Sequence, residues 1–316
     1  MEKKTVKTDL VIIGAGPAGM TAAIYAMRAG LSTVVLEKGI VGGQIAQSSI
    51  VENYPGYVSI TGMELSEKLR SHVLALGAVI DEFDFIERVE FSGEVKRVIT
   101  ESKVYEPTAV IFATGAVHKP LLIRNEARFH GKGIHYCALC DAAAYKGKTV
   151  GVVGGGSAAL EEALYLANIA EKVIVIRRKS SFNAEKAIIA KAEQTPNIEI
   201  LYNTDLLDAG GENMLEYALV TDVVTREERK IPMSAIFAYI GSVPQTELLR
   251  GCIKLDKRGY VVTDEDMKTN IDGIFAAGDV RSKRYRQIVT AVSDGAIAAL
   301  NAEKYIVSMK KGMVQK

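Results

Sequence analysis

The sequence is short of the residues that mark several classes of protein. Cysteine occurs three times in 316 residues, which is too few for the paired framework of a small secreted protein. Neither charge dominates, since 39 basic and 38 acidic residues leave a net charge of +1. A chain this neutral does not bind nucleic acid through phosphate neutralisation alone. The composition therefore predicts neither a disulfide scaffold nor a nucleic-acid partner.

Long hydrophobic runs are also missing. No apolar run reaches the roughly 18 residues needed to cross a bilayer. The first nine residues are largely charged or polar, and the apolar run 10–13 is too short for the core of a secretory signal. We therefore expect no membrane partner and a cytoplasmic, reducing location. Hydrophobic residues make up 48% of the chain and charged residues 24%, which is typical of a folded globular protein of roughly two domains.

A glycine-rich segment near the N-terminus is predicted to bind a dinucleotide. The apolar run 10–13 precedes Gly14-Ala15-Gly16-Pro17-Ala18-Gly19, and a helical pattern over about 20–29 follows it. A second β-type run, 33–36, ends at Glu37. Strand, G-x-G-x-x-G, helix, strand and acid in this order are the parts of a dinucleotide-binding unit. Without a ligand, the same segment would be only a tight strand-to-helix turn.

Each glycine of this motif has its own expected role. Gly14 permits the tight turn, Gly16 lets the backbone approach a pyrophosphate, and Gly19 lets helix and strand pack closely. Glu37 lies 23 residues after Gly14, where a carboxylate can accept a hydrogen bond from a ribose hydroxyl. An acidic residue at this position favours FAD.

The pattern repeats in the middle of the chain with the opposite charge. The β-type run 149–153 leads into Gly154-Gly155-Gly156-Ser157-Ala158-Ala159, a helical pattern follows, and the run 172–176 ends at Arg177-Arg178-Lys179. Arg177 lies 23 residues after Gly154, at the offset that Glu37 has from Gly14. Arginine can hold a 2′-phosphate that a carboxylate would repel, so this site favours NADPH. The alternative is a solvated basic end of a strand.

The last third of the sequence returns to the first domain. The segment 270–279 ends in Gly-Asp and resembles the segment 109–115, which ends in Thr-Gly. The intervening residues therefore look inserted, with Pro120 and Pro244 near the two crossings. The predicted fold is α/β, with two Rossmann-like dinucleotide-binding domains, the second inserted into the first. The expected boundaries are 1–117 with 245–316 for the FAD-binding domain and 118–244 for the NADPH-binding domain.

Two cysteines lie just before the second glycine motif, in Cys137-Ala138-Leu139-Cys140-Asp141. A structural zinc site needs four ligands, and only His135 and the distant Cys252 are available. Two inert core cysteines are a second alternative. The C-x-x-C spacing beside two redox-type nucleotide sites favours a redox-active pair. Asp141 could supply a proton, or it could cap the helix that the following alanines predict.

Taken together, these motifs resemble the low-molecular-weight thioredoxin reductase family, over essentially the whole chain. The matching stretches are 14–19, 42–44, 51–56, 137–141, 154–159, 273–279 and 285–287. The resemblance implies that Cys140 is the sulfur nearest the flavin, that Cys137 attacks the protein substrate and that Asp141 is the acid. It also implies thioredoxin or a thioredoxin-like protein as the substrate, and a homodimer.

The expected cofactor contacts follow from the motifs and the resemblance together. For FAD they are Gly14, Gly16, Ala18, Gly19, Glu37, Lys38, Gly43, Gln44, Asn53, Gly115, Asp279, Arg286 and Gln287. For NADPH they are Gly154, Gly156, Ser157, Ala158, Arg177, Arg178 and Lys179. No metal is expected.

The second site departs from the basic motif of the family, His-Arg-Arg-x-x-x-Arg. Lys179 and Asn183 replace its last two arginines, and neither offers the guanidinium fork. An electron donor other than NADPH, either NADH or ferredoxin, is therefore an alternative, as is an oxidase of small dithiols. A flavin-bound redox sensor without turnover is an alternative of another class. The intact second glycine motif favours a nicotinamide donor.

Chain order also predicts a motion. Cys140 lies 14 residues before Gly154, so the dithiol and the NADPH site belong to one domain while the other holds the flavin. Both must approach the same flavin ring closely, and they cannot easily share one face at one time. We therefore expect the inserted domain to swing about its connections, near 116–120 and 241–245.

Overall fold

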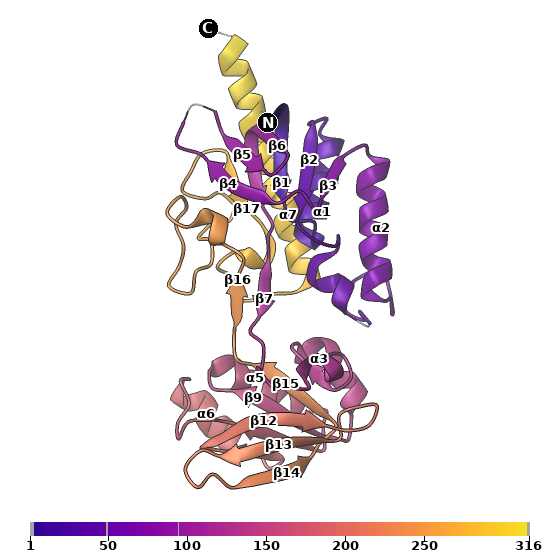
Figure 1. Cartoon of the computed structure of the whole chain (residues 1–316), viewed down its shortest axis with the longest axis vertical. Helices are drawn as coiled ribbons and strands as arrows, with labels where there is room; N and C mark the ends of the chain where they lie inside the picture. Colours follow the sequence, from indigo (N-terminus) through magenta and orange to yellow (C-terminus); the bar gives the residue numbers. More distant parts are fainter. Residues whose placement is uncertain (1–2, 49, 94, 315–316) are drawn as a thin grey trace. The chain divides into compact units, whose positions relative to one another are not determined.

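The computed structural model describes residues 3–48, 50–93 and 95–314, and the chain divides into two compact units. Unit 1 consists of residues 1–117 and 243–316, and unit 2 consists of residues 118–242 (Figure 1). The chain re-enters unit 1 at Val243, two residues before the boundary that the sequence suggests. The architecture is α/β, with a mainly parallel sheet in each unit.

Unit 1 is built on a sheet with the strand order β3-β2-β1-β6-β5-β4, and β17 pairs with β6. The four pairings among β3, β2, β1, β6 and β17 are parallel, whereas β4, β5 and β6 pair antiparallel. The strands are β1 (Lys4–Ile13), β2 (Thr33–Glu37), β3 (Val79–Glu82), β4 (Ile86–Glu90), β5 (Arg97–Thr100), β6 (Lys103–Phe112) and β17 (Ile274–Ala276). The helices are α1 (Pro17–Arg28), η1 (Gly43–Gln47), α2 (Gly62–Ala75), η3 (Glu247–Leu249), η4 (Gly278–Val280) and α7 (Ile288–Val314).

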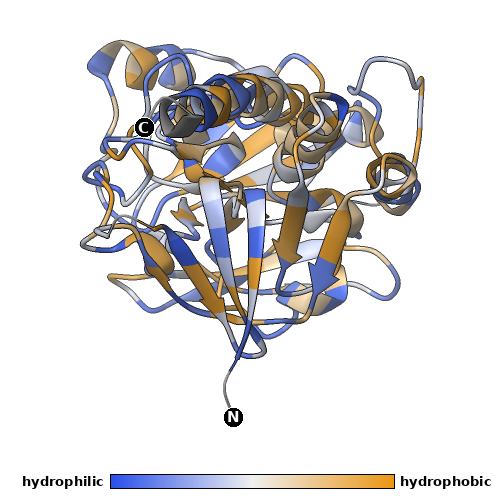
Figure 2. Cartoon of the chain, turned by 90° about the horizontal axis from the view of Figure 1, so that it is seen from above, coloured by the Kyte–Doolittle hydropathy of each residue, from blue (hydrophilic) through white to orange (hydrophobic). Residues whose placement is uncertain are grey.

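Burial explains why these segments form the central layer. Residues 10–13 of β1 are all buried, as parallel strands covered on both faces are. Helix α1 begins at Pro17, three residues before the expected start, because proline is well suited to the first turn of a helix. A β-carbon at Gly295 of α7 would lie 2.1 Å from the Ala18 carbonyl oxygen, so the two helices pack in close contact. Figure 2 shows polar and apolar segments alternating along α7, the helix that ends at the C label.

Unit 2 has a five-stranded parallel sheet in the order β11-β10-β9-β15-β8. Its strands are β8 (Ile134–His135), β9 (Thr149–Gly154), β10 (Lys172–Ile176), β11 (Ile198–Leu201) and β15 (Ala235–Tyr239). An antiparallel sheet adds β12 (Thr204–Gly210), β13 (Tyr217–Asp222) and β14 (Glu228–Pro232). The helices are α3 (Glu126–Phe129), α4 (Ala138–Asp141), η2 (Ala142–Tyr145), α5 (Ser157–Leu166) and α6 (Lys186–Glu193).

The two connections between the units run side by side. They contain β7 (Ala116–His118) and β16 (Ser242–Pro244), which pair as a two-stranded sheet. Gly115 and Gly241 flank these strands with φ of +68° and +103°, a backbone region that glycine occupies without strain. Among the described residues, no helix is long and apolar enough to cross a membrane.

Candidate functional site

The glycines of the first turn have two kinds of surroundings. Gly14 and Gly19 are packed tightly against backbone atoms, whereas Gly16 has open space beside it. A β-carbon at Gly14 would lie 2.4 Å from the Ala113 carbonyl oxygen, and one at Gly19 would lie 1.8 Å from that of Gly14. A β-carbon at Gly16 would meet no atom of the described residues within 4 Å. Gly16 is also the N-cap residue of α1, where free backbone N–H groups point outward. The turn therefore presents an open backbone at the start of a helix, as a pyrophosphate site requires.

Glu37 lies directly against this turn. Its Oε2 accepts a hydrogen bond from the Ala15 N–H at 2.7 Å, and its Oε1 accepts one from the Gly39 N–H at 2.9 Å. The carboxylate is thus fixed beside the turn, at the end of β2. The neighbouring Lys38 donates instead to Gln245 Oε1 at 3.1 Å.

Residues far apart in the sequence meet at the same end of the sheet. A β-carbon at Gly43 would lie 3.3 Å from the Gly16 α-carbon, so η1 begins against the glycine turn. Asn53 Nδ2 donates to Gln287 Oε1 at 3.3 Å, which joins the 51–56 segment to the start of α7. Gln44 is exposed. Ala18 is buried, and a β-carbon at Gly278 would lie 2.9 Å from the Ala18 β-carbon, so the Ala18 side chain packs against η4.

Asp279 and Arg286 carry buried polar atoms that lack partners. Within the described residues, Asp279 Oδ1 and Arg286 Nε are buried without a hydrogen bond. Burial raises the pKa of Asp279 above 3.8, against the opposing charges of Lys283 and Arg286. Lys283 Nζ is 3.9 Å from Asp279 Oδ1, too far for a hydrogen bond. Such groups, beside an open glycine turn, fit a polar cofactor that would complete their hydrogen bonds.

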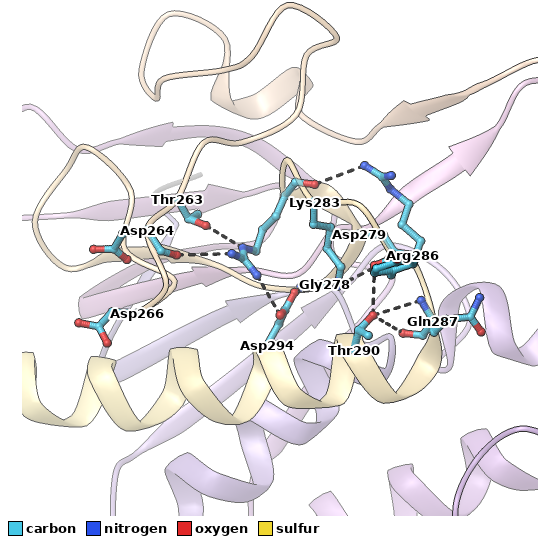
Figure 3. Close-up of polar contacts among 12 residues, drawn as sticks. Thr263, Asp264, Asp266, Gly278, Asp279, Lys283, Arg286, Gln287, Thr290 and Asp294 are labelled. Carbon is cyan, nitrogen blue, oxygen red and sulfur yellow. Dashed lines mark hydrogen bonds and ion pairs between the residues drawn. The ribbon is translucent and has the colours of Figure 1, made fainter. Parts of the chain in front are cut away.

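A buried carboxylate that the sequence analysis did not single out holds this region in place (Figure 3). Asp294, on α7, is 7% exposed and accepts a hydrogen bond from the Gly278 N–H at 3.0 Å. It also forms ion pairs with Arg281 at 2.8 Å and with Lys283 at 2.9 Å. Asp294 therefore fixes the backbone that presents Asp279. No local motif marks it, because its partners lie 11 to 16 residues away.

The second glycine turn shows the same geometry with a cation beside it. A β-carbon at Gly154 would lie 2.5 Å from that of Ala159, and one at Gly155 would lie 1.8 Å from Arg177 Nη1. Gly156 is the N-cap residue of α5, with Ser157 and Ala158 as the first two helical residues. The Arg177 guanidinium thus lies over the turn, and its Nε donates to the Ser181 carbonyl at 2.8 Å.

The rest of the basic segment is less fixed. Arg178 is exposed and 3.9 Å from Asp205, and Lys179 is exposed. Asn183, one of the departures from the family pattern, donates its backbone N–H to the Gly155 carbonyl at 2.9 Å. The structure therefore places Arg177 and Asn183 at the turn.

Cys137 and Cys140 form a disulfide with their α-carbons 5.3 Å apart. This pairing contradicts the zinc alternative, and the described residues contain no group of three or more metal-ligating side chains. Cys140 is exposed and Cys137 is half-buried, so the pair is not an inert core feature. Asp141 takes the N-cap position of η2, but its side chain makes no capping hydrogen bond within the described structure. The capping alternative for Asp141 is therefore wrong.

The disulfide segment is tied to the second glycine turn by a tyrosine that the sequence analysis missed. Tyr239 pairs with Gly154 in the sheet, and its hydroxyl accepts a hydrogen bond from the Ala138 N–H at 2.7 Å. Burial and the charge of Glu162 raise the pKa of Tyr239. Burial also raises the pKa of Glu162, which hydrogen bonds with Tyr239. The C-x-x-C and the glycine turn therefore belong to one packed assembly.

The Asp141 side chain has a polar neighbour that the sequence analysis did not single out for it. His135 Nδ1 is 3.3 Å from Asp141 Oδ2, and His135 Nε2 is 2.7 Å from the Tyr145 hydroxyl. Asp141 and Tyr145 lie near His135 because the His135 ring is buried between the elements that carry them. Its position two residues before Cys137 was the one available signal.

A dithiol pair beside one glycine turn and a second such turn in the other unit define the class of the nucleotide-dependent disulfide oxidoreductases. The model of the family described as "Pyridine nucleotide-disulphide oxidoreductase" matches residues 8–295. Within it, the chain belongs to the low-molecular-weight thioredoxin reductase family of flavoprotein oxidoreductases.

Individual relatives match over almost the whole chain. The "34.2 kDa protein in rubredoxin operon" of Clostridium pasteurianum is 46% identical, covering 96% of this chain and 99% of the relative. The thioredoxin reductase of Listeria monocytogenes is 42% identical, covering 96% of each. The crystal structure of thioredoxin reductase from Streptococcus pyogenes matches with a TM-score of 0.92 at 37% identity, covering 96% of this chain and 99% of that one.

A more distant solved structure has ferredoxin in its name. It is a "Ferredoxin-Flavin Thioredoxin Reductase" from Clostridium acetobutylicum, with a TM-score of 0.53 at 31% identity, covering 96% of this chain and 99% of that one.

Proposed function

We propose that this protein passes electrons from NADPH through FAD and the Cys137–Cys140 dithiol to the disulfide of thioredoxin or a thioredoxin-like protein. One observation carries the proposal: Tyr239 ties the C-x-x-C segment to the second glycine turn, while the first turn lies in the other unit. The names of the relatives support thioredoxin as the substrate.

The residues of unit 2 have defined tasks in this reaction. FAD, when bound, relays two electrons from a nicotinamide to a disulfide. Entry of two electrons breaks the Cys137–Cys140 bond, and each sulfur needs one proton to become a thiol. Asp141 is next to Cys140 in sequence and supplies one of these protons.

The substrate step restores the disulfide. Cys137, as a thiolate, attacks one sulfur of the partner disulfide, and the other sulfur leaves with a proton. Cys140 then attacks the mixed disulfide, which releases the second partner thiol and re-forms the Cys137–Cys140 bond. The partner gains two electrons and two protons, and this chain returns to its starting state.

The FAD contacts are proposed on the geometry of unit 1. The open backbone at Gly16 and the fixed Glu37 fit the pyrophosphate and ribose, and the partnerless atoms of Asp279 and Arg286 fit the flavin end. Arg177 over the second turn supports NADPH. We also propose a rotation of unit 2 about the paired β7 and β16 between the half-reactions, on the chain order of the two sites.

A homodimer, by resemblance to the family, and a cytoplasmic location, from the scarcity of cysteine, complete the proposal. Light scattering after size-exclusion chromatography tests the homodimer, because a monomer would give the 34.2 kDa mass of one chain.

Ferredoxin or NADH is the second candidate for the donor. Lys179 and Asn183 stand where the family motif has arginines, and Asn183 uses its backbone at the glycine turn. The name of the C. acetobutylicum relative includes ferredoxin, which supports this second candidate.

Anaerobic titration of the flavin protein separates these candidates. We expect NADPH to bleach the flavin band faster than NADH or reduced ferredoxin, and thioredoxin to restore it. Faster bleaching by ferredoxin would overturn the donor assignment. Consumption of a small dithiol with oxygen would indicate an oxidase, and bleaching without steady turnover would indicate a sensor.

Cys140→Ser is the control for the dithiol step. We expect it to retain bleaching by NADPH and to lose thioredoxin reduction. Retained thioredoxin reduction in this variant would remove the C-x-x-C from the mechanism.

A further inference from the structure

His135 is buried two residues before the redox disulfide, and both of its ring nitrogens lie near polar groups. It is 8% exposed, at the end of β8, and its ring stacks on Phe237 with a centroid separation of 5.4 Å. Nδ1 faces Asp141 Oδ2 at 3.3 Å and Nε2 faces the Tyr145 hydroxyl at 2.7 Å. Tyr145 is 5% exposed, and burial followed by the charge of Asp141 raises its pKa.

The chemistry of these three groups selects one arrangement of protons. A neutral imidazole has one N–H donor and one acceptor nitrogen, and an ionised carboxylate can only accept. A neutral His135 that carries its proton on Nδ1 therefore presents an N–H to Asp141 Oδ2, at an ion-pair distance of 3.3 Å, and its Nε2 accepts from the Tyr145 O–H. The same arrangement holds when Asp141 is protonated, provided that the proton is on Oδ1. In this arrangement, Oδ2 of Asp141 faces His135, and Oδ1 of Asp141 is the atom that gains and loses the proton.

We propose that His135, supported by Tyr145, is the positioning residue for Asp141 in opening the Cys137–Cys140 disulfide. This inference rests on the role of Asp141 as the acid in the proposed function. When two electrons from a dithiol or a reduced flavin break the S–S bond, Asp141 Oδ1 gives its proton to one of the two sulfurs. The Nδ1–H of His135 then stabilises the carboxylate that remains.

Opening by dithiothreitol tests the proposal without NADPH or thioredoxin. In the oxidised flavin protein, a dithiothreitol thiolate attacks one sulfur, the S–S bond breaks, and the second dithiothreitol thiol closes the ring of oxidised dithiothreitol. Two protein thiols result, and alkylation with mass analysis counts them over time. The exposed free thiol of Cys252 serves as an internal standard.

Four variants and one control separate a positioning role of His135 from simple packing. We expect His135→Leu, which removes the donor, to slow opening about tenfold, and His135→Asn, whose amide can replace Nδ1–H, to stay within about threefold of the parent. Asp141→Asn should be slow, and adding His135→Leu to it should cost less than about twofold more, because the two residues act as a unit. His130→Leu, an exposed histidine of the same unit, is the matched control and should have no effect.

Additive losses in the double variant, or an unchanged rate in Asp141→Asn, would overturn the proposal. The ¹⁵N spectrum of the four histidines gives a second measurement, with the His135 signal assigned from His135→Asn. We expect the neutral Nδ1–H form for His135 in the oxidised protein, and the Nε2–H form would overturn the proposal. Fast opening without NADPH-driven thioredoxin reduction would contradict the proposed function alone.

Discussion

At the scale of single residues, the glycines of the first turn divide into two kinds. Gly19 has no room for a β-carbon, because the Gly14 carbonyl oxygen would be 1.8 Å away. Gly16 has room, and its φ of −76° is open to any residue. The chain itself therefore requires glycine at position 19, whereas only a ligand close to the backbone requires it at position 16.

This difference predicts opposite results for two alanine variants. We expect Gly19→Ala to lower the free energy of unfolding by about 3 kcal/mol, because backbone must move. Gly16→Ala should change it by less than about 0.5 kcal/mol in the flavin-free protein but should strongly reduce flavin content after purification. Urea unfolding and the flavin-to-protein absorbance ratio measure the two effects. Normal flavin content in Gly16→Ala would contradict the pyrophosphate site at this turn.

Asp279 gives a prediction for pH at the same scale. Burial raises its pKa in the folded chain above 3.8, so the folded state binds more protons than the unfolded state as the pH rises from 3.8 through the folded pKa. The free energy of unfolding falls over that window. Asp279→Asn removes this loss, so we expect its stability relative to the parent to increase from pH 4.5 to pH 7 in the flavin-free protein.

Urea unfolding at several pH values measures this difference, with Asp272→Asn as the control. Asp272 is an exposed carboxylate of the same unit, so its substitution controls for the removal of one negative charge from the surface. A relative stability of Asp279→Asn that falls as the pH rises would show that the opposing charges outweigh burial.

At the scale of elements, the ends of two equivalent strands place opposite charges at the two glycine turns. Strand β2 ends at Glu37, whose carboxylate is held by the first turn, and β10 is followed by Arg177, whose guanidinium covers the second turn. Glu37 and Arg177 therefore hold equivalent positions in the two units, but their charges are opposite. Arg178 and Lys179 continue the chain beyond β10 on exposed positions and lack this contact with the turn.

Arg177 should therefore control selection of the 2′-phosphate more than Lys179 does. We expect Arg177→Ala to reduce the preference of kcat/KM for NADPH over NADH by about tenfold or more, because a charge-assisted bidentate contact is lost. Lys179→Ala should reduce it by less than about threefold. Steady-state kinetics with both nucleotides measure the ratio. Equal effects of the two substitutions would indicate only a diffuse basic surface.

The sequence predicted the elements that follow a local pattern. Strand β10 has the predicted bounds, 172–176, and the packing roles of Gly14 and Gly19, the first and third glycines of the first turn, follow from motif spacing. Strand β1 begins at Lys4, six residues before the apolar run, because pairing with β6 extends beyond the buried part. Antiparallel β12–β14 has only partly buried strands and gave no comparable signal.

The parts of the site that the sequence did not reveal depend on tertiary packing. Asp294 and Tyr239 act on residues 11 or more positions away, so no local spacing marks them. His135 is close to the cysteines in sequence, but its contact with Tyr145 exists only because η2 turns back against β8. The motifs thus indicate the chemistry, and the fold adds the groups that orient it.

At the scale of the whole molecule, the order of the sites along the chain is the main constraint. The dithiol and the second glycine turn share unit 2 through Tyr239, and the first turn belongs to unit 1. Two groups on one body cannot both occupy the same face of a third group on another. We therefore propose that a cycle in which both groups react at one face uses two poses of unit 2, with the paired β7 and β16 as the connections between the described parts of the two units.

A covalent lock between the units tests this requirement. One new cysteine on each unit, in a Cys252→Ser background, can be joined by a bifunctional maleimide while Cys137 and Cys140 are protected as their disulfide. We expect the locked protein to support either bleaching of the flavin by NADPH or its reoxidation by thioredoxin, but not both. Turnover should fall by about a hundredfold, because one reacting pair is held out of contact.

The same variant capped with a monofunctional maleimide is the control and should keep its full turnover. The two half-reactions are measured separately by stopped-flow absorbance, so a general loss of activity is distinguishable from a selective one. If locks at several different pairs of positions all retained both half-reactions, a single pose would serve the whole cycle. The chain order would then have to be reconciled with electron transfer that needs no close contact between the reacting groups.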